Sequence, residues 1–374
     1  MKLKLYCDRA WVPPDCNHLE ILDPFWGGDH YDPEGNALQI GRAYAARAGE
    51  IFEIVSTMEE SDAVLLPTDW SQIRRRPAEM ARTRDLMERA RASGRHVIIH
   101  YRPDAPLQVN WPAHAVVFRT AMLLSQRRPN EFILPQWSRD YLADMGGEVQ
   151  IRPKEEIPVV GFCGFAPPIG MRPGKRWFKE SARLMAHRAG LGVLFPTRMA
   201  HAARARGLIA LSRSPLVKTN YLIRSESAFD NPLGAFLPGG TAEAAVHRRR
   251  EFVQNILASD YVLCARGWAN CSIRFYETLS LGRIPVLVDT DSVLPCGFAI
   301  DWRKYCVVVR ENALNQAAHQ IREFHEALAP GEFEALQRDC RALWEEWFSP
   351  FGFFKNLHRH LEPLPPETLA PFLS

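Results

Sequence analysis

Short apolar runs alternate with longer segments of mixed apolar and charged residues along most of the chain. The apolar run at residues 63–67 predicts a buried strand that ends at proline. A helical pattern follows over residues 77–93, and the apolar run at residues 97–101 predicts the next strand. Gly94 comes directly after the helical pattern, at the position where helix C-termini favour glycine. Strand, helix and strand in this order predict a parallel α/β sheet.

The alternation breaks near residues 145–158, where two glycines precede a charged stretch that contains proline. A new strand begins at residues 157–164, and strands and helices alternate again through most of the second half. We therefore predict two domains, residues 1–152 and 153–345, followed by a helical tail over 346–374. Two parallel α/β domains in one chain predict facing sheets with a cleft between them, where small molecules bind.

Composition narrows the class of protein. The 374 residues are too many for one ordinary core, and 47% apolar with 24% charged residues is ordinary for a globular chain. The net charge of +3 and the lack of a long basic run argue against nucleic acid as a partner. No window holds about 18 apolar residues without charge, so we expect no transmembrane helix. The N-terminus also lacks the apolar stretch of a signal peptide.

The eight cysteines form no Cys-x-x-Cys pair, and Cys264 and Cys306 lie within apolar runs. This pattern favours reduced thiols over a disulfide framework or a zinc site. We therefore expect a cytoplasmic protein, with peripheral association at a membrane surface left open.

One βαβ unit carries most of the candidate chemistry. Residues 261–264 are a short apolar strand, a loop follows, and Ser272 is placed to cap a helix that Gly282 ends. Residues 284–288 form the next strand. The N-terminus of such a helix presents free backbone N–H groups and the positive end of the helix dipole, which together favour a phosphate.

Two arginines lie close to this helix N-terminus, Arg266 in the loop and Arg274 in the first turn. Their charges oppose the helix dipole, and a bound diphosphate would remove that conflict. Glu277 lies three residues after Arg274, on the same helix face. It is placed either to hold the ribose hydroxyls of a nucleotide or to form an ion pair with Arg274, and the spacing leaves both open.

These runs resemble the core of the exostosin family of glycosyltransferases, most closely its bacterial branch. The resemblance is specific over about residues 249–311 and rests on residues 259–267, 272–279, 282–286, 294–295 and 300–302. It extends loosely to residues 62–67 and 130–135. It implies a GT-B fold, an α/β architecture of two Rossmann-like domains facing a central cleft. It also implies inverting hexosyl or glycuronosyl transfer from a nucleotide sugar, mostly UDP-linked, to a glycan or another hydroxyl acceptor.

The resemblance also implies roles for particular residues. Arg266, Ser272 and Arg274 would contact the donor diphosphate, Glu277 would hold the ribose, and Gly267 belongs to the same loop. Two weaker donor-site candidates come from the residues themselves. Gly164 ends a strand where glycine lets a ligand approach the backbone, and Arg224 follows another apolar run.

The acceptor side is expected in the N-terminal half. Residues 23–31 combine aromatic side chains, two glycines and titratable groups, and aromatic faces with polar neighbours suit a sugar. Asp29 and His30 are the candidate bases that would deprotonate the acceptor hydroxyl. Further polar residues follow other apolar runs, and a structural or solvated role is favoured for each of Asp69, His100 and Asp104. Arg119, next to another apolar run, is placed to steer the anionic donor or to fix an acidic acceptor.

Residues Asp289 and Asp291 spell Asp-x-Asp, a pattern that binds a metal in another glycosyltransferase fold. In this sequence the pattern follows a predicted strand, so we interpret it as a turn that ends the strand. We expect no metal and no other cofactor, because two arginines and a helix N-terminus can neutralise a departing diphosphate. Two alternatives stay open: a nucleotide-sugar epimerase or hydrolase of the same fold, and a non-catalytic module that binds a nucleotide or glycan.

Overall fold

The computed structural model describes residues 2–28, 44–166, 200–224, 242–267 and 269–362. It divides the chain into two compact units, each described by itself below. Unit 1 comprises Met1–Arg139, Asp291–Ile300 and Glu345–Ser374. Unit 2 comprises Asp140–Thr290 and Asp301–Trp344.

Unit 1 is built on a parallel sheet with strand order β2-β1-β3-β4-β5-β6 among the described residues. Its strands are β1 Leu3–Tyr6, β2 Phe52–Val55, β3 Ala63–Leu65, β4 His96–Tyr101, β5 Ala115–Arg119 and β6 Glu131–Ile133. Its α-helices are α1 Asp23–Trp26, α3 Ala48–Ile51, α4 Trp70–Ile73, α5 Pro77–Ala92 and α12 Pro350–Lys355. Its 3₁₀ turns are η1 Arg9–Trp11, η2 Glu20–Leu22, η3 Leu124–Gln126 and η9 Leu357–His360.

The two faces of this sheet bury separate cores, because successive side chains of a strand point to opposite faces. In β4, Val97 and Ile99 pack with Leu86 and Met87 of α5. Ile98 points the other way, into a core covered by the short helices of the unit. Both faces are therefore apolar, as a parallel sheet with helices on both sides requires.

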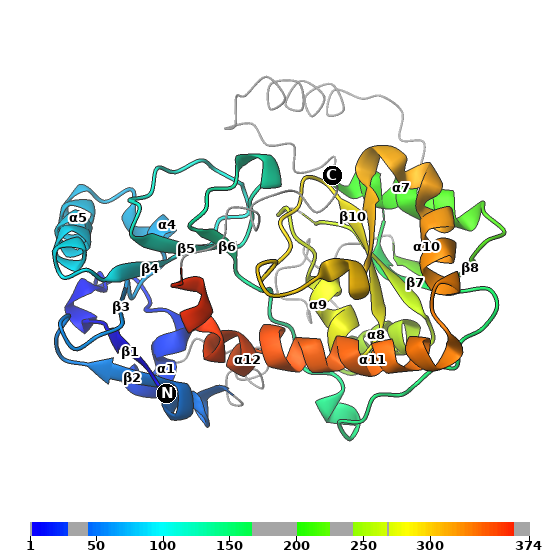
Figure 1. Cartoon of the computed structure of the whole chain (residues 1–374), viewed down its shortest axis with the longest axis horizontal. Helices are drawn as coiled ribbons and strands as arrows, with labels where there is room; N and C mark the ends of the chain where they lie inside the picture. The colour runs from blue at the N-terminus through cyan, green and yellow to red at the C-terminus, as the bar shows by residue number, and fades with distance from the viewer. Residues whose placement is uncertain (1, 29–43, 167–199, 225–241, 268, 363–374) are drawn as a thin grey trace. The chain divides into compact units, whose positions relative to one another are not determined.

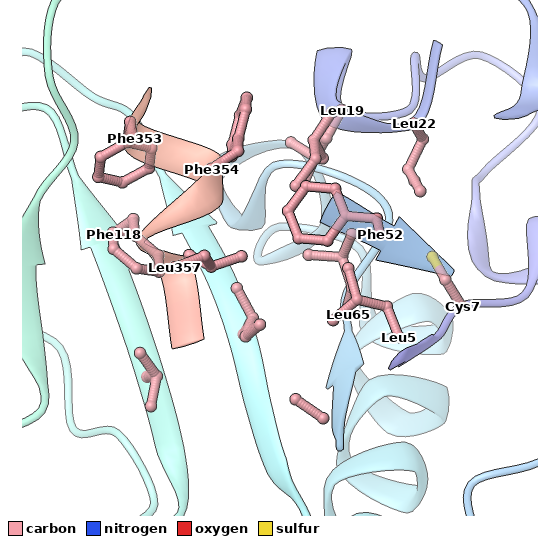
Figure 2. Packing of buried hydrophobic residues seen from close by; sticks show 14 of the residues in the cluster. Leu5, Cys7, Leu19, Leu22, Phe52, Leu65, Phe118, Phe353, Phe354 and Leu357 are labelled. Carbon is pink, nitrogen blue, oxygen red and sulfur yellow. The ribbon is translucent and has the colours of Figure 1, made fainter. Parts of the chain in front are cut away.

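The C-terminal segment completes the second core. Phe353 and Phe354 of α12 and Leu357 of η9 pack over Phe118 of β5 together with residues of the N-terminal strands (Figure 2). The ring centroids of Phe353 and Phe118 lie 5.5 Å apart in an edge-to-face arrangement. The segment expected as a separate helical tail is thus part of the hydrophobic core of unit 1.

Unit 2 holds a second parallel sheet, with strand order β11-β10-β9-β7-β8 among the described residues. Its strands are β7 Val159–Phe165, β8 Lys218–Arg224, β9 Tyr261–Cys264, β10 Ile284–Asp289 and β11 Val307–Arg310. Its α-helices are α7 Ala200–Ser212, α8 Ala242–Leu257, α9 Ile273–Ser280, α10 Ala317–Glu326 and α11 Pro330–Leu343. Shorter turns are η4 Ala143–Met145, η6 Trp302–Lys304 and η7 Glu311–Gln316, and a π-helical turn, η8 Trp344–Phe348, passes from unit 2 into unit 1.

Helices cover both faces of this second sheet. Helices α7 and α10 pack against each other on one face, and α9 packs with α11 on the other (Figure 1). The strand order reverses at β7, because β8 lies on one side of β7 and β9 on the other. Ligands of open α/β sheets bind at such a reversal, outside the carboxyl ends of the strands.

The predicted α/β class with two parallel sheets is confirmed, and it is the pair of units expected of a GT-B protein. The predicted strands and helices recur with small shifts at their ends. The stretch that follows Leu208 forms the end of α7 and strand β8. The units separate at Arg139–Asp140, whereas the sequence predicts a boundary at 152–153. In the part of the chain that the structure describes, no helix is long and apolar enough to span a membrane.

The role of the C-terminal segment in the core of unit 1 can be tested by truncating Phe353, which is fully buried. We expect Phe353→Ala to reduce the free energy of unfolding of unit 1 by about 3–5 kcal/mol, the usual effect of removing a buried phenylalanine. Urea unfolding measures it. The exposed neighbour Lys355 is the control, and Lys355→Ala should stay within about 0.5 kcal/mol of wild type. Equal stability of the two variants would show that this segment adds nothing to the core.

Candidate functional site

Arg274, in the first turn of α9, lies against the end of strand β7. Its Nη2 donates to the carbonyl of Cys163 at 2.6 Å, and its guanidinium carbon lies 4.3 Å from the ring centroid of Phe162. A β-carbon at residue 164 would lie 2.8 Å from Arg274 Nη2, and Gly164 has a φ of +145°. Only glycine combines that backbone with so close an approach. The group that approaches the backbone of Gly164 in the structure is therefore Arg274.

Arg266 lies in the loop that follows β9 and is 7% exposed. Its Nη1 lies 3.3 Å from Oδ1 of Asn270, a buried amide that also accepts from Oγ1 of Thr290 at 2.7 Å. Burial lowers the pKa of Arg266 to about 10. The guanidinium stays charged at neutral pH, at a cost in desolvation that a bound anion would offset.

Arg204 of α7 ties the ends of β7 and β9 together, and sequence reasoning missed it. Its Nη1 donates to the carbonyl of Phe165 at 2.9 Å, and its Nη2 to the carbonyls of Ala265 at 3.3 Å and Arg266 at 3.0 Å. Burial, followed by repulsion from Arg274, lowers the pKa of Arg204 to about 9. Arg204 therefore holds the loop of Arg266 in place and adds a third positive charge. The sequence pattern around Arg204 predicts only a helix, and nothing in it indicates that this side chain bonds to the ends of β7 and β9.

The hydrogen bonds of Arg204 and Arg274 go to neutral carbonyl oxygens. Among the described residues, neither guanidinium has a carboxylate within 4.0 Å. Buried cations are normally paired. Two guanidinium groups without an ion-paired carboxylate among the described residues, those of Arg204 and Arg274, thus lie at the carboxyl ends of β7 and β9, where the strand order reverses.

The N-terminus of α9 opens on the same loop. Ser272 occupies the N-cap position, as predicted, but its side chain makes no capping hydrogen bond. Gly267 lies in the loop before it, where its N–H donates to the carbonyl of Cys271 at 3.3 Å. Gly282 follows the helix with a φ of +65°, which agrees with the predicted helix end. The first N–H groups of α9 therefore face the loop without the expected side-chain cap.

Glu277 lies one turn further along α9 and is partly buried. Burial raises the pKa of Glu277 to about 7, while the charge of Arg274 and a hydrogen bond with Tyr141 act in the opposite direction. The Arg274 guanidinium donates its hydrogen bond to Cys163 and not to Glu277. The structure therefore does not contain the Arg274–Glu277 ion pair, which was one of the two interpretations of the sequence.

The remaining candidate of unit 2, Arg224 at the end of β8, has a structural partner. Its Nη2 lies 2.9 Å from Oε2 of Glu251 on α8 and 3.9 Å from Sγ of Cys163. Its charge is thus balanced by a carboxylate, unlike the charges of Arg204 and Arg274.

In unit 1, the candidate bases Asp29 and His30 lie outside the described residues. Arg119 forms a buried ion pair with Glu131, with its Nη1 2.6 Å from Oε1. Trp111 also donates to this carboxylate, at 2.9 Å. This buried ion pair gives Arg119 a structural role within the sheet of unit 1.

The other polar candidates of unit 1 lie near the carboxyl ends of β3 and β4. Asp69 caps α4 and accepts from Nε of Arg102 at 3.0 Å, and Glu20 accepts from Nη1 of Arg102 at 2.7 Å. His100 is 2% exposed, and burial lowers its pKa to about 4. Asp104 is exposed.

The two carboxylates of the Asp-x-Asp pattern belong to different units. Asp289 ends β10 in unit 2, whereas Asp291 belongs to unit 1, where its Oδ1 accepts from the N–H of Ser125 at 3.0 Å. Asp291 has a φ of 63°, which is typical of a turn. No group of three or more potential metal ligands occurs in the described segments.

These features define an α/β protein whose second unit carries a candidate anion site, with buried and partly buried arginines at a reversal of strand order. Residues 235–324, which include Arg266, Arg274 and the whole of α9, match the family model of the Exostosin GT47 domain. That segment belongs to the exostosin family of glycosyltransferase domains, as the resemblance predicted.

Two relatives support this assignment. Exostosin-1 of Drosophila melanogaster is 35% identical over 91 residues, which are 24% of this chain and 11% of that protein. The probable glucuronosyltransferase GUT1 of Oryza sativa subsp. japonica is 35% identical over 65 residues, 17% of this chain and 16% of the relative. The match thus spans less than a fifth of the length of either relative.

Among solved structures, a mutant of S. aureus TarM in complex with Fondaparinux, alpha-GlcNAc-glycerol and UDP resembles the chain distantly. The match covers 71% of this chain and 51% of the other, with 11% identity and a TM-score of 0.33. A likeness of this size carries no argument about the site.

The raised pKa of Glu277 predicts a pH-dependent difference in stability. A carboxyl whose pKa is higher in the folded protein stabilises that state at low pH, and the contribution is lost as the pH rises through about 7. We therefore expect Glu277→Gln to melt close to wild type at pH 5 and above wild type at pH 8. Thermal melts across this range measure the difference. The exposed Glu323 of α10 is the control, and Glu323→Gln should show no such trend. A constant offset between Glu277→Gln and wild type would contradict the assignment.

Proposed function

We propose that the chain is a glycosyltransferase that moves a sugar from a nucleotide-sugar donor to a hydroxyl acceptor. The observation that carries the proposal is the group of arginines at the ends of β7 and β9, inside and beside a segment of the exostosin family. The departing group of such a reaction is a nucleoside diphosphate, whose negative charge grows in the transition state. Preorganised cations and helix N–H groups stabilise that charge.

The finer assignment follows the chemistry of the residues. Arg266, Arg274 and the N-terminus of α9 hold the diphosphate, and Glu277 accepts hydrogen bonds from the ribose hydroxyls. Ser272 and Gly267 belong to the loop between β9 and α9 that contacts the diphosphate. Gly164 contributes because it lacks a β-carbon and so leaves room for the guanidinium of Arg274. We propose a UDP-linked donor, a glycan acceptor, transfer of a hexosyl or glycuronosyl group, and inversion at the anomeric carbon. Because the hydroxyl attacks opposite the departing diphosphate in an inverting transfer, the reaction needs a base on the acceptor side.

A panel of nucleotide sugars tests the donor assignment first. A ligand at 100 times its dissociation constant stabilises a protein by about 2.7 kcal/mol, so a cognate UDP-sugar should raise the melting temperature clearly. Release of UDP that depends on an added acceptor then identifies transfer. Release by donor alone would indicate a hydrolase or epimerase, and binding without any release would indicate a non-catalytic module.

Arg274 is the residue whose loss should affect donor binding most. Hydrogen bonds to charged groups contribute about 1.5–3 kcal/mol, so Arg274→Ala should weaken UDP binding by roughly 10- to 100-fold. Calorimetric titration with UDP measures the change. Arg250→Ala, at an exposed position of α8, is the matched control and should bind UDP as wild type does. Equal affinity of Arg274→Ala and wild type would place the diphosphate elsewhere.

We further propose that transfer needs no divalent metal, because the arginines already supply positive charge. The prediction is full acceptor-dependent activity after metal stripping and in excess EDTA. If EDTA abolishes activity and magnesium or manganese restores it, the proposal is wrong, and Asp289 becomes a site candidate.

The cytoplasmic location stays a prediction from the cysteine pattern.

A further inference from the structure

One side chain of α7 joins the ends of two neighbouring strands in unit 2. Nη1 of Arg204 donates to the carbonyl of Phe165, the last residue of β7, at 2.9 Å. Its Nη2 donates to the carbonyls of Ala265 and Arg266, in the loop that follows β9, at 3.3 Å and 3.0 Å. Because arginine presents five N–H donors in one rigid plane, a single side chain can hold both strand ends at once.

The surroundings of Arg204 are unfavourable for a cation. Its guanidinium carbon lies 5.9 Å from the ring centroid of Phe162, and the guanidinium carbon of Arg274 lies 4.3 Å from the same ring. Burial and then the charge of Arg274 lower the pKa of Arg204 to about 9, and its Nε has no hydrogen-bond partner among the described residues. A neutral donor would bond to the carbonyls without this desolvation and repulsion. The charge at this position therefore costs stability, which is typical of residues that serve a functional site.

The residue that Arg204 holds is itself a candidate for the donor site. The main-chain carbonyl of Arg266 accepts from Arg204, and Nη1 of Arg266 lies 3.3 Å from Oδ1 of Asn270. Arg266 is thus fixed at its main chain by one residue and at its guanidinium by another. A β-carbon at the next residue, Gly267, would meet no atom of the described residues within 4 Å. At this point the loop is therefore held by hydrogen bonds more than by packing, and Arg204 supplies two of them.

We propose that Arg204 is a positioning residue of the donor site, which holds the main chain of Arg266 so that the guanidinium of Arg266 meets the diphosphate. The inference rests on the proposed function and adds to it a residue that acts through another. Arg274 is held separately, through the carbonyl of Cys163. Loss of Arg204 should therefore release the loop and reduce what Arg266 contributes to binding, because a group that is ordered only when the ligand arrives binds less tightly.

A double-mutant cycle on the full chain tests this coupling. Calorimetric titration measures the dissociation constants of UDP and of inorganic pyrophosphate for wild type, Arg204→Gln, Arg266→Gln and the double variant. Pyrophosphate reports on the diphosphate without the nucleoside. Arg204→Gln alone should weaken the binding of both probes about tenfold, and by less than about twofold when Arg266 is already replaced, since coupled residues give non-additive losses.

Two further variants separate positioning from charge and from folding. Arg204→Lys keeps the positive charge without the planar fork, so it should bind both probes about as weakly as Arg204→Gln. Arg206, on the same helix, has a side chain that is 56% exposed and pairs with Glu311. Arg206→Gln is the matched control and should bind as wild type does. Without ligand, both Arg204 variants should melt within about 3 °C of wild type, because the cation removed is costly to bury.

The outcomes that overturn the inference differ from those that overturn the proposed function. Additive losses in the cycle, or wild-type affinity of Arg204→Lys, would show that Arg204 does not act by holding Arg266, while the donor site would stand. A large fall in the melting temperature of the ligand-free variants would assign Arg204 to the fold alone. If Arg204→Gln does not fold, the cycle is measured with Arg204→Lys. If wild type binds neither UDP nor pyrophosphate, the proposed donor site fails and this inference fails with it.

Discussion

The Arg274 guanidinium can lie on the end of strand β7 because residue 164 has no β-carbon. A methyl group there would come within 2.8 Å of Arg274 Nη2, and the hydrogen bond to Cys163 and the stacking on Phe162 would be displaced. Arg204 fixes the neighbouring loop through the carbonyls of Phe165, Ala265 and Arg266. In the proposed anion site, Gly164 and Arg204 thus position other groups, and the guanidinium of Arg274 is held in place without a ligand. Such preorganisation is what stabilises a developing charge efficiently.

Each unit follows the same rule for placing polar groups. Both sheets are parallel, both bury apolar side chains on two faces, and both reverse strand order next to their first strand. The carboxyl edge at that reversal is where polar side chains occur without disturbing a core. In unit 2 the edge carries arginines, which suit a diphosphate. In unit 1 it carries the His18–Asp23 pair, with Nε2 of His18 3.0 Å from Oδ1 of Asp23.

Much of this architecture could be predicted from local patterns. The strands around residues 63–67 and 261–264 and the helix before Gly94 follow from apolar runs and turn residues, which act over a few positions. Arg266 and Arg274 were found because a βαβ unit places them near one helix terminus. The role of Arg204 could not be predicted in this way, because its hydrogen-bond partners belong to elements distant in sequence. Ser272 was placed correctly at the N-cap, yet its side chain makes no capping bond. Arg119 pairs with Glu131 across neighbouring strands, a contact that requires the register of β5 and β6.

The central claim is that the carboxyl ends of β7 and β9 and the N-terminus of α9 bind a nucleoside diphosphate. Hydrogen exchange of backbone amides in the presence and absence of UDP tests this location directly, without knowledge of the sugar or the acceptor. The account predicts slower exchange with UDP in residues 264–277 and at the end of β7 near Gly164, with no comparable change in α5 of unit 1. Unchanged exchange in residues 264–277 at saturating UDP, or protection confined to other segments, would contradict it.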